Sequence, residues 1–271
     1  MPDIFQSIDE LDSDKQTMVA DRLENRAKLD QFAAIRERYF DKIGLPATGT
    51  VHELGCGTGV VCRAIAARPQ FAGTVTGSDL SASLIDVATE MTAKSGLSNV
   101  RFFQADGQGS DQHDMHYDLV LAHTTISHVS DPKAFLNEAV RLAKPGGKVV
   151  IHDGDYASMT FDTSTPALDL EMSEKILQAV VANRYVMRQM PRLLKEANVD
   201  ITHAIGDVVL EAGNGEYLPM LARNYCPIAV SAGLARQADV DVWLSALDRA
   251  LSESVFFGSC SFATYCAAKP H

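Results

Sequence analysis

The sequence predicts an α/β fold in which helices cover both faces of a mostly parallel sheet. Strand-like and helix-like stretches alternate from about residue 50 to residue 152, a rhythm typical of βαβ units with right-handed crossovers. A short apolar run also ends in the turn Glu53–Gly59, in which three glycines are spaced two apart. Glycine allows a positive φ and lets a ligand approach bare backbone, so this turn predicts a ligand site between a strand and a helix.

The chain begins with a helical pattern. Apolar residues recur at helical spacing from about Ser13 to Ile43, and Gly44-Leu45-Pro46 stops the pattern. We therefore expect residues 1–46 to form an N-terminal helical cap and residues 47–271 to form one large domain. A chain of 271 residues that is 46% hydrophobic can bury a single large core of this kind.

Strands and helices then alternate. We expect strands near residues 50–54, 73–78, 99–104, 118–122 and 147–152, and helices near residues 58–68, 81–95 and 131–143. The rhythm changes after Asp155, where helical insertions at about 160–198 and 214–254 flank a strand near 200–211, and Val255–Ala268 reads as a last strand. The insertions and the N-terminal helices together predict a lid over the carboxyl ends of the strands, where open α/β sheets bind ligands.

The composition of the chain argues against several kinds of partner and site. The net charge of −11, without a cluster of Lys or Arg, argues against nucleic acid as a partner. The five cysteines are odd in number and contain no C-x-x-C pair, which argues against a disulfide framework and against a metal site. The start of the chain is acidic and no apolar run reaches membrane-spanning length. We expect a cytoplasmic monomer or homodimer that binds a small molecule and no membrane.

Glycine spacing separates two cofactor classes. A dinucleotide fingerprint is G-x-G-x-x-G, but here Gly59 comes one residue early and Val60 occupies the expected place. Carboxylates end the next two strands. Asp79 can accept hydrogen bonds from ribose hydroxyls and Asp106 from an adenine amino group. The pattern therefore favours an adenosine-containing ligand other than NAD.

In order and spacing, these features resemble the class I S-adenosylmethionine-dependent methyltransferases. The resemblance spans roughly residues 50 to 155 and includes His123 after the fourth strand and Pro145-Gly146-Gly147 before the fifth. It implies a Rossmann-like sheet of seven strands in the order 3-2-1-4-5-7-6, with Val255–Ala268 as the inserted antiparallel strand. It implies S-adenosylmethionine as cofactor, held by Glu53, Gly55, Cys56, Gly57, Gly59, Asp79, Leu80, Asp106, Gly107 and His123.

The implied reaction is an in-line displacement on a small-molecule acceptor at oxygen, nitrogen or carbon. Alignment of the reacting atoms supplies on the order of 7–11 kcal/mol, more than a general base adds. If the acceptor must lose a proton, the candidates near strand ends are His128, Asp153, Asp155 and His123. Candidate substrate-binding residues on the helical segments are Arg22, Arg26, Tyr185 and Tyr225.

Two other functions use the same cofactor. A methyltransferase-like enzyme can catalyse another displacement, such as a lyase-type cyclisation that releases methylthioadenosine. A non-enzymatic protein can bind the cofactor for regulation. A complete set of ligand motifs beneath a helical lid favours an enzyme, and the early Gly59 makes an NAD-dependent oxidoreductase the weakest alternative.

Overall fold

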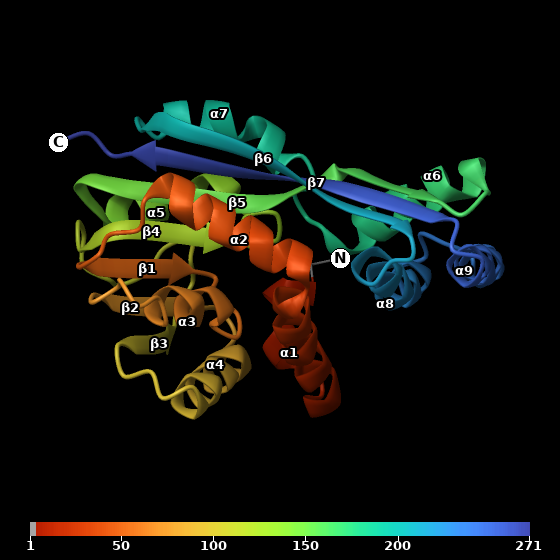
Figure 1. The fold of residues 1–271 in the computed structure, drawn as a ribbon, viewed down its shortest axis with the longest axis horizontal. Helices are drawn as coiled ribbons and strands as arrows, with labels where there is room; N and C mark the ends of the chain where they lie inside the picture. Colours follow the sequence, from red (N-terminus) through yellow and green to blue (C-terminus); the bar gives the residue numbers. More distant parts are fainter. Residues whose placement is uncertain (1–3) are drawn as a thin grey trace.

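The computed structural model describes residues 4–271, which are built around one seven-stranded sheet (Figure 1). The sheet order is β3-β2-β1-β4-β5-β7-β6, and β7 runs antiparallel to both neighbours, so the predicted order and the predicted inserted strand are confirmed. The strands are β1 (Thr50–Leu54), β2 (Thr74–Asp79), β3 (Val100–Gln104), β4 (Tyr117–His123), β5 (Ala143–Asp162), β6 (Asp200–Gly213) and β7 (Phe256–Ala268).

Helices pack on both faces of this sheet. They are α1 (Ser13–Lys28), α2 (Asp30–Ile43), α3 (Val60–Ala66), α4 (Ala82–Lys94), α5 (Pro132–Leu142), α6 (Pro166–Val180), α7 (Val186–Glu196), α8 (Tyr217–Ser231) and α9 (Gln237–Ser252), preceded by 3-10 turns η1 (Ile4–Gln6) and η2 (Ile8–Glu10). Successive residues of a strand point to opposite faces. On β4, Leu119 and Leu121 join the core with α2 and α3, whereas Val120 and Ala122 pack with α5 and α7.

The N-terminal helical segment breaks at Leu29. This residue adopts an extended conformation (φ −62°, ψ 131°), which ends α1 and starts α2. Helix α2 crosses the face of the sheet, whereas α1 stands at the carboxyl end of β1 (Figure 1). The break therefore brings one face of α1 to the edge of the sheet where the glycine turn lies.

Strand β5 is longer than the sequence predicted. It continues to Asp162 because β7 pairs with it along most of its length, from Lys148 opposite Ala268 to Asp162 opposite Phe257, with a register shift after Asp155. The outer parts of β5, β6 and β7 project beyond the parallel strands and carry α6, α8 and α9 (Figure 1). The first helical insertion consequently begins at Pro166, and α8 faces back toward the glycine turn.

None of the helices within residues 4–271 is both long enough and apolar enough to cross a membrane. All five cysteines are buried and unpaired.

Candidate active site

A cavity of about 290 Å³ lies at the carboxyl ends of β1, β2, β3 and β4. The N-terminal 3-10 turns, α1 and α8 enclose it from the other side. It brings together most of the residues that the sequence nominated, namely Arg22, Arg26, Glu53, Gly55, Cys56, Gly57, Asp79, Leu80, Asp106, Gly107, His123, His128 and Tyr225. Four nominated residues, Gly59, Asp153, Asp155 and Tyr185, are not among its lining residues.

The glycine turn is shaped by contacts that exclude a side chain. Gly55 has φ 67°, and a Cβ there would lie 2.1 Å from Cγ2 of Thr125. Gly59 has φ 76°, and a Cβ there would lie 2.5 Å from the Phe102 ring. Gly55 therefore presents bare backbone to the cavity, whereas Gly59 lets α3 begin tightly against β3.

Asp79 connects this turn to the end of β2. Its Oδ2 accepts a hydrogen bond from the N–H of Gly57 at 2.8 Å, and its Oδ1 accepts one from the N–H of Ser81 at 3.0 Å. Burial raises the pKa of Asp79, and the two backbone donors oppose this shift. The neighbouring Leu80 is 45% exposed and also lines the cavity.

Asp106 begins the next segment of the wall. Its Oδ1 accepts hydrogen bonds from the backbone and side-chain nitrogens of Gln108, at 2.8 and 3.2 Å. The side-chain oxygen Oε1 of Gln108 in turn accepts from the Ser130 hydroxyl and the Asp131 N–H, both at 2.7 Å. Gly107 leaves room for the Phe135 ring, which a Cβ would meet at 2.7 Å. These contacts fix Asp106 against the start of α5.

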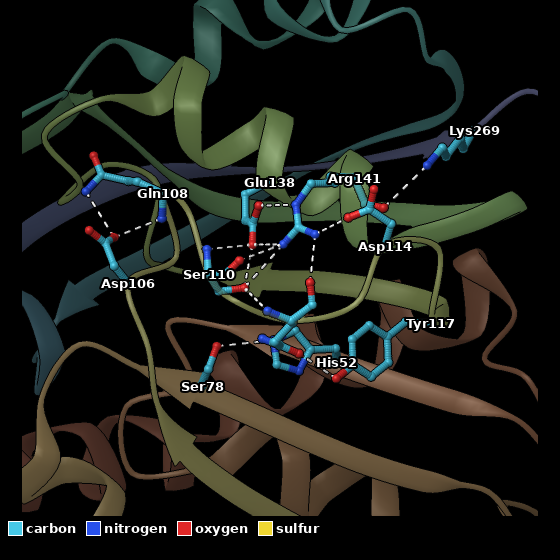
Figure 2. A network of polar contacts seen from close by, with 11 residues as sticks. His52, Ser78, Asp106, Gln108, Ser110, Asp114, Tyr117, Glu138, Arg141 and Lys269 are labelled. Carbon is cyan, nitrogen blue, oxygen red and sulfur yellow. Dashed lines mark hydrogen bonds and ion pairs between the residues drawn. The ribbon is translucent and has the colours of Figure 1, made fainter.

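A polar network behind Asp106 holds the rest of this segment (Figure 2). Ser110 donates to Glu138 from its N–H at 3.0 Å and from its hydroxyl at 2.5 Å. Arg141 forms a bidentate pair with Glu138, at 2.7 and 2.6 Å. Although burial alone would raise the pKa of Glu138, the hydrogen bonds of Arg141 and Ser110 hold it below its ordinary value. The network thus ties the segment that follows β3 to α5.

Glu53 is a buried acid in the cavity wall. Its Oε2 accepts hydrogen bonds from the N–H of Cys62 at 3.1 Å and from its thiol at 3.0 Å. Burial raises the pKa of Glu53 to about 8, so most of the side chain carries a proton at pH 7. Glu53 therefore braces the first turn of α3 while one side of it faces the cavity.

His123, at the end of β4, belongs to a stack of buried rings. Its Nδ1 lies 2.9 Å from the Tyr39 hydroxyl, and its ring stacks on His152 with centroids 4.5 Å apart. Burial lowers the pKa of His123 well below its ordinary value, so the imidazole is neutral. His152 bonds to the Thr264 hydroxyl at 2.8 Å and is a core residue. The sequence around His123 did not predict its contact with Tyr39, because Tyr39 lies on α2, far away in the chain.

Two of the other nominated base candidates, His128 and Asp153, have different surroundings. His128 lines the cavity and packs against the Phe5 ring, with centroids 4.5 Å apart. Asp153 is fully buried, and its carboxylate accepts the N–H groups of Ser127 at 3.0 Å and Gly154 at 2.8 Å. Asp153 is thus placed to hold the loop that carries His128 rather than to meet a ligand in this cavity.

The alternation of side chains along β5 explains why Tyr156, rather than Asp153 or Asp155, lines the cavity. Asp155 forms an ion pair with Arg188, with Oδ1 2.8 Å from Nε, on the α7 side of the sheet. Tyr156, the next residue, points the other way and lines the cavity. A period of two along β5 was the available signal, because it places neighbouring side chains on opposite faces.

Of the nominated substrate residues, Arg22, Arg26 and Tyr225 line the cavity, whereas Tyr185 does not. Arg22 lies between the rings of Phe5 and Tyr225, at 5.0 and 5.2 Å from the ring centres. Tyr185 is 45% exposed and lies under Arg184 and Arg188, outside the cavity. Further lining residues that the sequence did not indicate come from α2 and α8, and they include Phe32, Arg36, Tyr217, Met220 and Leu221.

Within residues 4–271 no group of three or more His, Cys, Asp and Glu side chains is placed to hold a metal ion.

Comparisons with known proteins agree with this geometry. Residues 47–167 match the family described as a methyltransferase domain. A ubiquinone biosynthesis O-methyltransferase of Brucella anthropi is 25% identical over 70% of this chain and 68% of that protein. An uncharacterized protein of a Streptomyces fradiae transposon is 26% identical over 83% of this chain and 65% of that protein. The chain therefore spans about two thirds of the length of these relatives.

A solved structure shows the same fold. A candidate methyltransferase of Bacillus halodurans is 16% identical, covers 87% of this chain and 99% of its own, and has a TM-score of 0.64. The sheet order defines a Rossmann-like α/β fold, and the cavity lies at the ends of its parallel strands. The domain match over residues 47–167, together with the methyltransferase relatives, supports a class I S-adenosylmethionine-dependent methyltransferase that uses S-adenosylmethionine as its cofactor.

Proposed function

We propose that the protein transfers the methyl group of S-adenosylmethionine to a small-molecule acceptor in the cavity between the strand ends, α1 and α8. One observation carries this proposal. The cavity is lined continuously from Asp106 and Gly107, where an adenine would lie, past the glycine turn to Arg22 and Tyr225 on the helical lid. It therefore extends beyond the strand ends that would hold the cofactor.

The residues at the strand ends fit an adenosyl cofactor. Gly55 offers bare backbone to the cofactor. The Asp79 carboxylate faces the same cavity, where it can accept hydrogen bonds from the ribose hydroxyls. Arg26 also lines the cavity and supplies a cation for the methionine carboxylate. When bound, the cofactor supplies an electrophilic methyl group on a sulfonium. The chain's own contribution is to align the acceptor with that methyl group and to exclude water beneath α1 and α8.

His128 is the proposed base for an acceptor that must lose a proton. It lines the cavity close to Tyr156, with ring centroids 6.2 Å apart. His123 is the weaker candidate because its pKa lies well below neutrality and Tyr39 occupies its Nδ1. Several relatives bear the name ubiquinone biosynthesis O-methyltransferase, so hydroxyl acceptors come first in a screen.

Product analysis tests the reaction. The protein is incubated with S-adenosylmethionine labelled in the methyl group and a fractionated metabolite extract. Formation of adenosylhomocysteine together with a labelled acceptor supports methyl transfer. Release of methylthioadenosine would instead support the lyase-type alternative. Cofactor binding without either product in any fraction would favour a binding protein.

A further inference from the structure

Arg22 and Arg26 lie one turn apart on α1, yet they face different parts of the cavity. Residues four apart share one face of a helix. The Arg26 Nη2 donates to the Thr124 hydroxyl at 2.7 Å. The next residue, Thr125, donates from its hydroxyl to the Gly55 carbonyl at 2.9 Å. Arg26 therefore lies beside the glycine turn, at the end of the cavity that we assign to the methionine part of the cofactor.

Arg22 points instead toward the lid. Its guanidinium lies over the Phe5 ring of the N-terminal segment and over the Tyr225 ring of α8, at 5.0 and 5.2 Å. Its neighbour Leu23 faces the glycine turn, since a Cβ at Gly57 would meet it at 3.1 Å. Helix α1 thus stands between the turn and α8, with Arg22 on the α8 side.

The Arg22 guanidinium is incompletely satisfied. Its Nη2 is buried, and no hydrogen-bond acceptor within residues 4–271 reaches it. The part of the chain that the structure describes also places no Asp or Glu oxygen within 4.0 Å of Arg22, although it does so for Arg63 and Arg141. Arg22 as a whole is half-buried, but a buried N–H group of a cation without an acceptor is costly, because its hydration is lost without compensation.

The acids that line the cavity are engaged elsewhere. Glu53 bonds to the start of α3, Asp79 to the glycine turn, and Asp106 to Gln108. Cations therefore dominate the end of the cavity beneath the lid, and Arg22 is the one held between two aromatic rings.

We infer that Arg22 binds an anionic group, a carboxylate or a phosphate, on the acceptor. The rings of Phe5 and Tyr225 on either side favour an acceptor whose body is flat and aromatic or conjugated, because such a body stacks on aromatic side chains and on a guanidinium plane. This inference rests on the proposed function. It adds the chemical class of the acceptor, an aromatic or conjugated acid.

The test uses binding rather than turnover. Calorimetry measures the affinity of the full chain first for adenosylhomocysteine, and then, with that ligand saturating, for benzoate, phenyl phosphate and the neutral benzamide. The variants are Arg22→Met, Arg22→Lys and the matched control Arg223→Met. Arg223 lies on α8, is 46% exposed and pairs with Asp248 at 2.6 Å. It is not among the residues that line the cavity.

We expect the wild-type chain to bind one of the two anions at least about tenfold more tightly than benzamide, as a charge-assisted contact predicts. The better anion identifies the group as carboxylate or phosphate. Arg22→Met should remove this preference and leave the affinity for adenosylhomocysteine within about threefold. Arg22→Lys should keep most of the preference, and Arg223→Met all of it.

Other outcomes overturn the inference. A wild-type chain that binds benzamide as well as both anions, or that binds neither anion at millimolar concentration, contradicts it. So does an Arg22→Met variant that loses adenosylhomocysteine but keeps the anion preference, because Arg22 would then hold the cofactor's own carboxylate. Failure of the wild-type chain to bind adenosylhomocysteine is a separate result that refutes the proposed function itself.

Discussion

The Asp79 carboxylate accepts a hydrogen bond from the backbone N–H of Gly57, with 2.8 Å between Oδ2 and nitrogen. This contact joins the glycine turn after β1 to the end of β2, two segments 22 residues apart in the chain. The same carboxylate faces the cavity. Asp79 therefore has two roles, one in shaping the turn and one in the proposed contact with ribose.

Asp79→Asn separates these roles. The amide keeps the shape, and its oxygen can still accept the Gly57 N–H, but its NH2 group cannot accept the Ser81 N–H, and the side chain has no charge to offer to hydroxyl groups. We expect the affinity for S-adenosylmethionine to fall by about 10- to 100-fold, the worth of charge-assisted hydrogen bonds, and the circular dichroism spectrum to stay unchanged. Calorimetry measures the affinity, and Asp86→Asn on the exposed side of α4 is the control. Normal binding by Asp79→Asn would limit Asp79 to a structural role.

Substitution of Gly55 tests the close contact between the glycine turn and Thr125. In Gly55→Ala the new methyl group would lie 2.1 Å from Cγ2 of Thr125. Gly96 has the same φ of 67° but no atom within 4 Å of a Cβ. Gly96→Ala should cost about 1–2 kcal/mol of stability from the left-handed backbone alone, and Gly55→Ala about 1–3 kcal/mol more from overpacking. Urea denaturation measures both.

A second substitution checks the cause. Thr125→Ala removes the atoms that the Gly55→Ala methyl group would meet first. The double variant should therefore be more stable than the sum of the two single effects predicts. Strict additivity would show that overlap with Thr125 is not what requires glycine at this position.

Glu53 should make stability fall as the pH rises. Its folded-state pKa of about 8 exceeds its ordinary value of 4.5 because of burial. Between these two pH values the folded chain holds a proton that the unfolded chain has released, so the free energy of unfolding decreases with pH. The stabilising contribution is complete below about pH 4.5 and is lost by about pH 8.

Glu53→Gln should flatten this dependence. Urea denaturation at pH 5.5 and 7.5 should show that the wild-type chain loses about 1–3 kcal/mol more than the variant does over this interval. Exposed Glu216→Gln is the control and should follow the wild-type profile. Parallel profiles for wild type and Glu53→Gln would mean that Glu53 is ionised in the folded chain.

Arg141 should stabilise the segment that carries Asp106. Arg141→Met leaves the Glu138 carboxylate, whose side chain is 5% exposed, without its cation. Because Arg141 itself is 30% exposed, we expect a loss of about 1–3 kcal/mol rather than the larger penalty of a fully buried pair. The affinity for S-adenosylmethionine should also fall, since the Ser110 carbonyl loses the hydrogen bond from Arg141 at 3.0 Å and the segment is then held to α5 only through Glu138.

Lys133→Met is the matched control for Arg141→Met, because Lys133 pairs with Glu196 on the surface, where the side chains are 61% and 42% exposed. It should change stability by less than about 1 kcal/mol and leave cofactor affinity unaltered. Equal effects of the two substitutions would contradict a special role for the pair of Arg141 and Glu138.

The residues nominated from the sequence line the cavity most consistently where the nomination depended on local sequence chemistry. Gly55, Asp79 and Asp106 follow strands whose apolar runs are visible in one dimension, and parallel strands bring their carboxyl ends to one edge. Prediction was weaker for side chains on β5, where Asp153 was nominated and Tyr156 lines the cavity. There the register relative to the sheet decides which face a residue occupies.

By itself, the sequence determined the alternation of strands and helices, the glycine turn and the acids behind it, because each depends on residues close together in the chain. Only the tertiary structure decided how far β5 extends, since β7 pairs with it from about a hundred residues away. The tertiary structure also decided that Tyr39 bonds to His123 and that the Arg22 guanidinium lies over the Tyr225 ring. Such contacts join helices to strands and loops distant in sequence, and packing of the whole chain selects them.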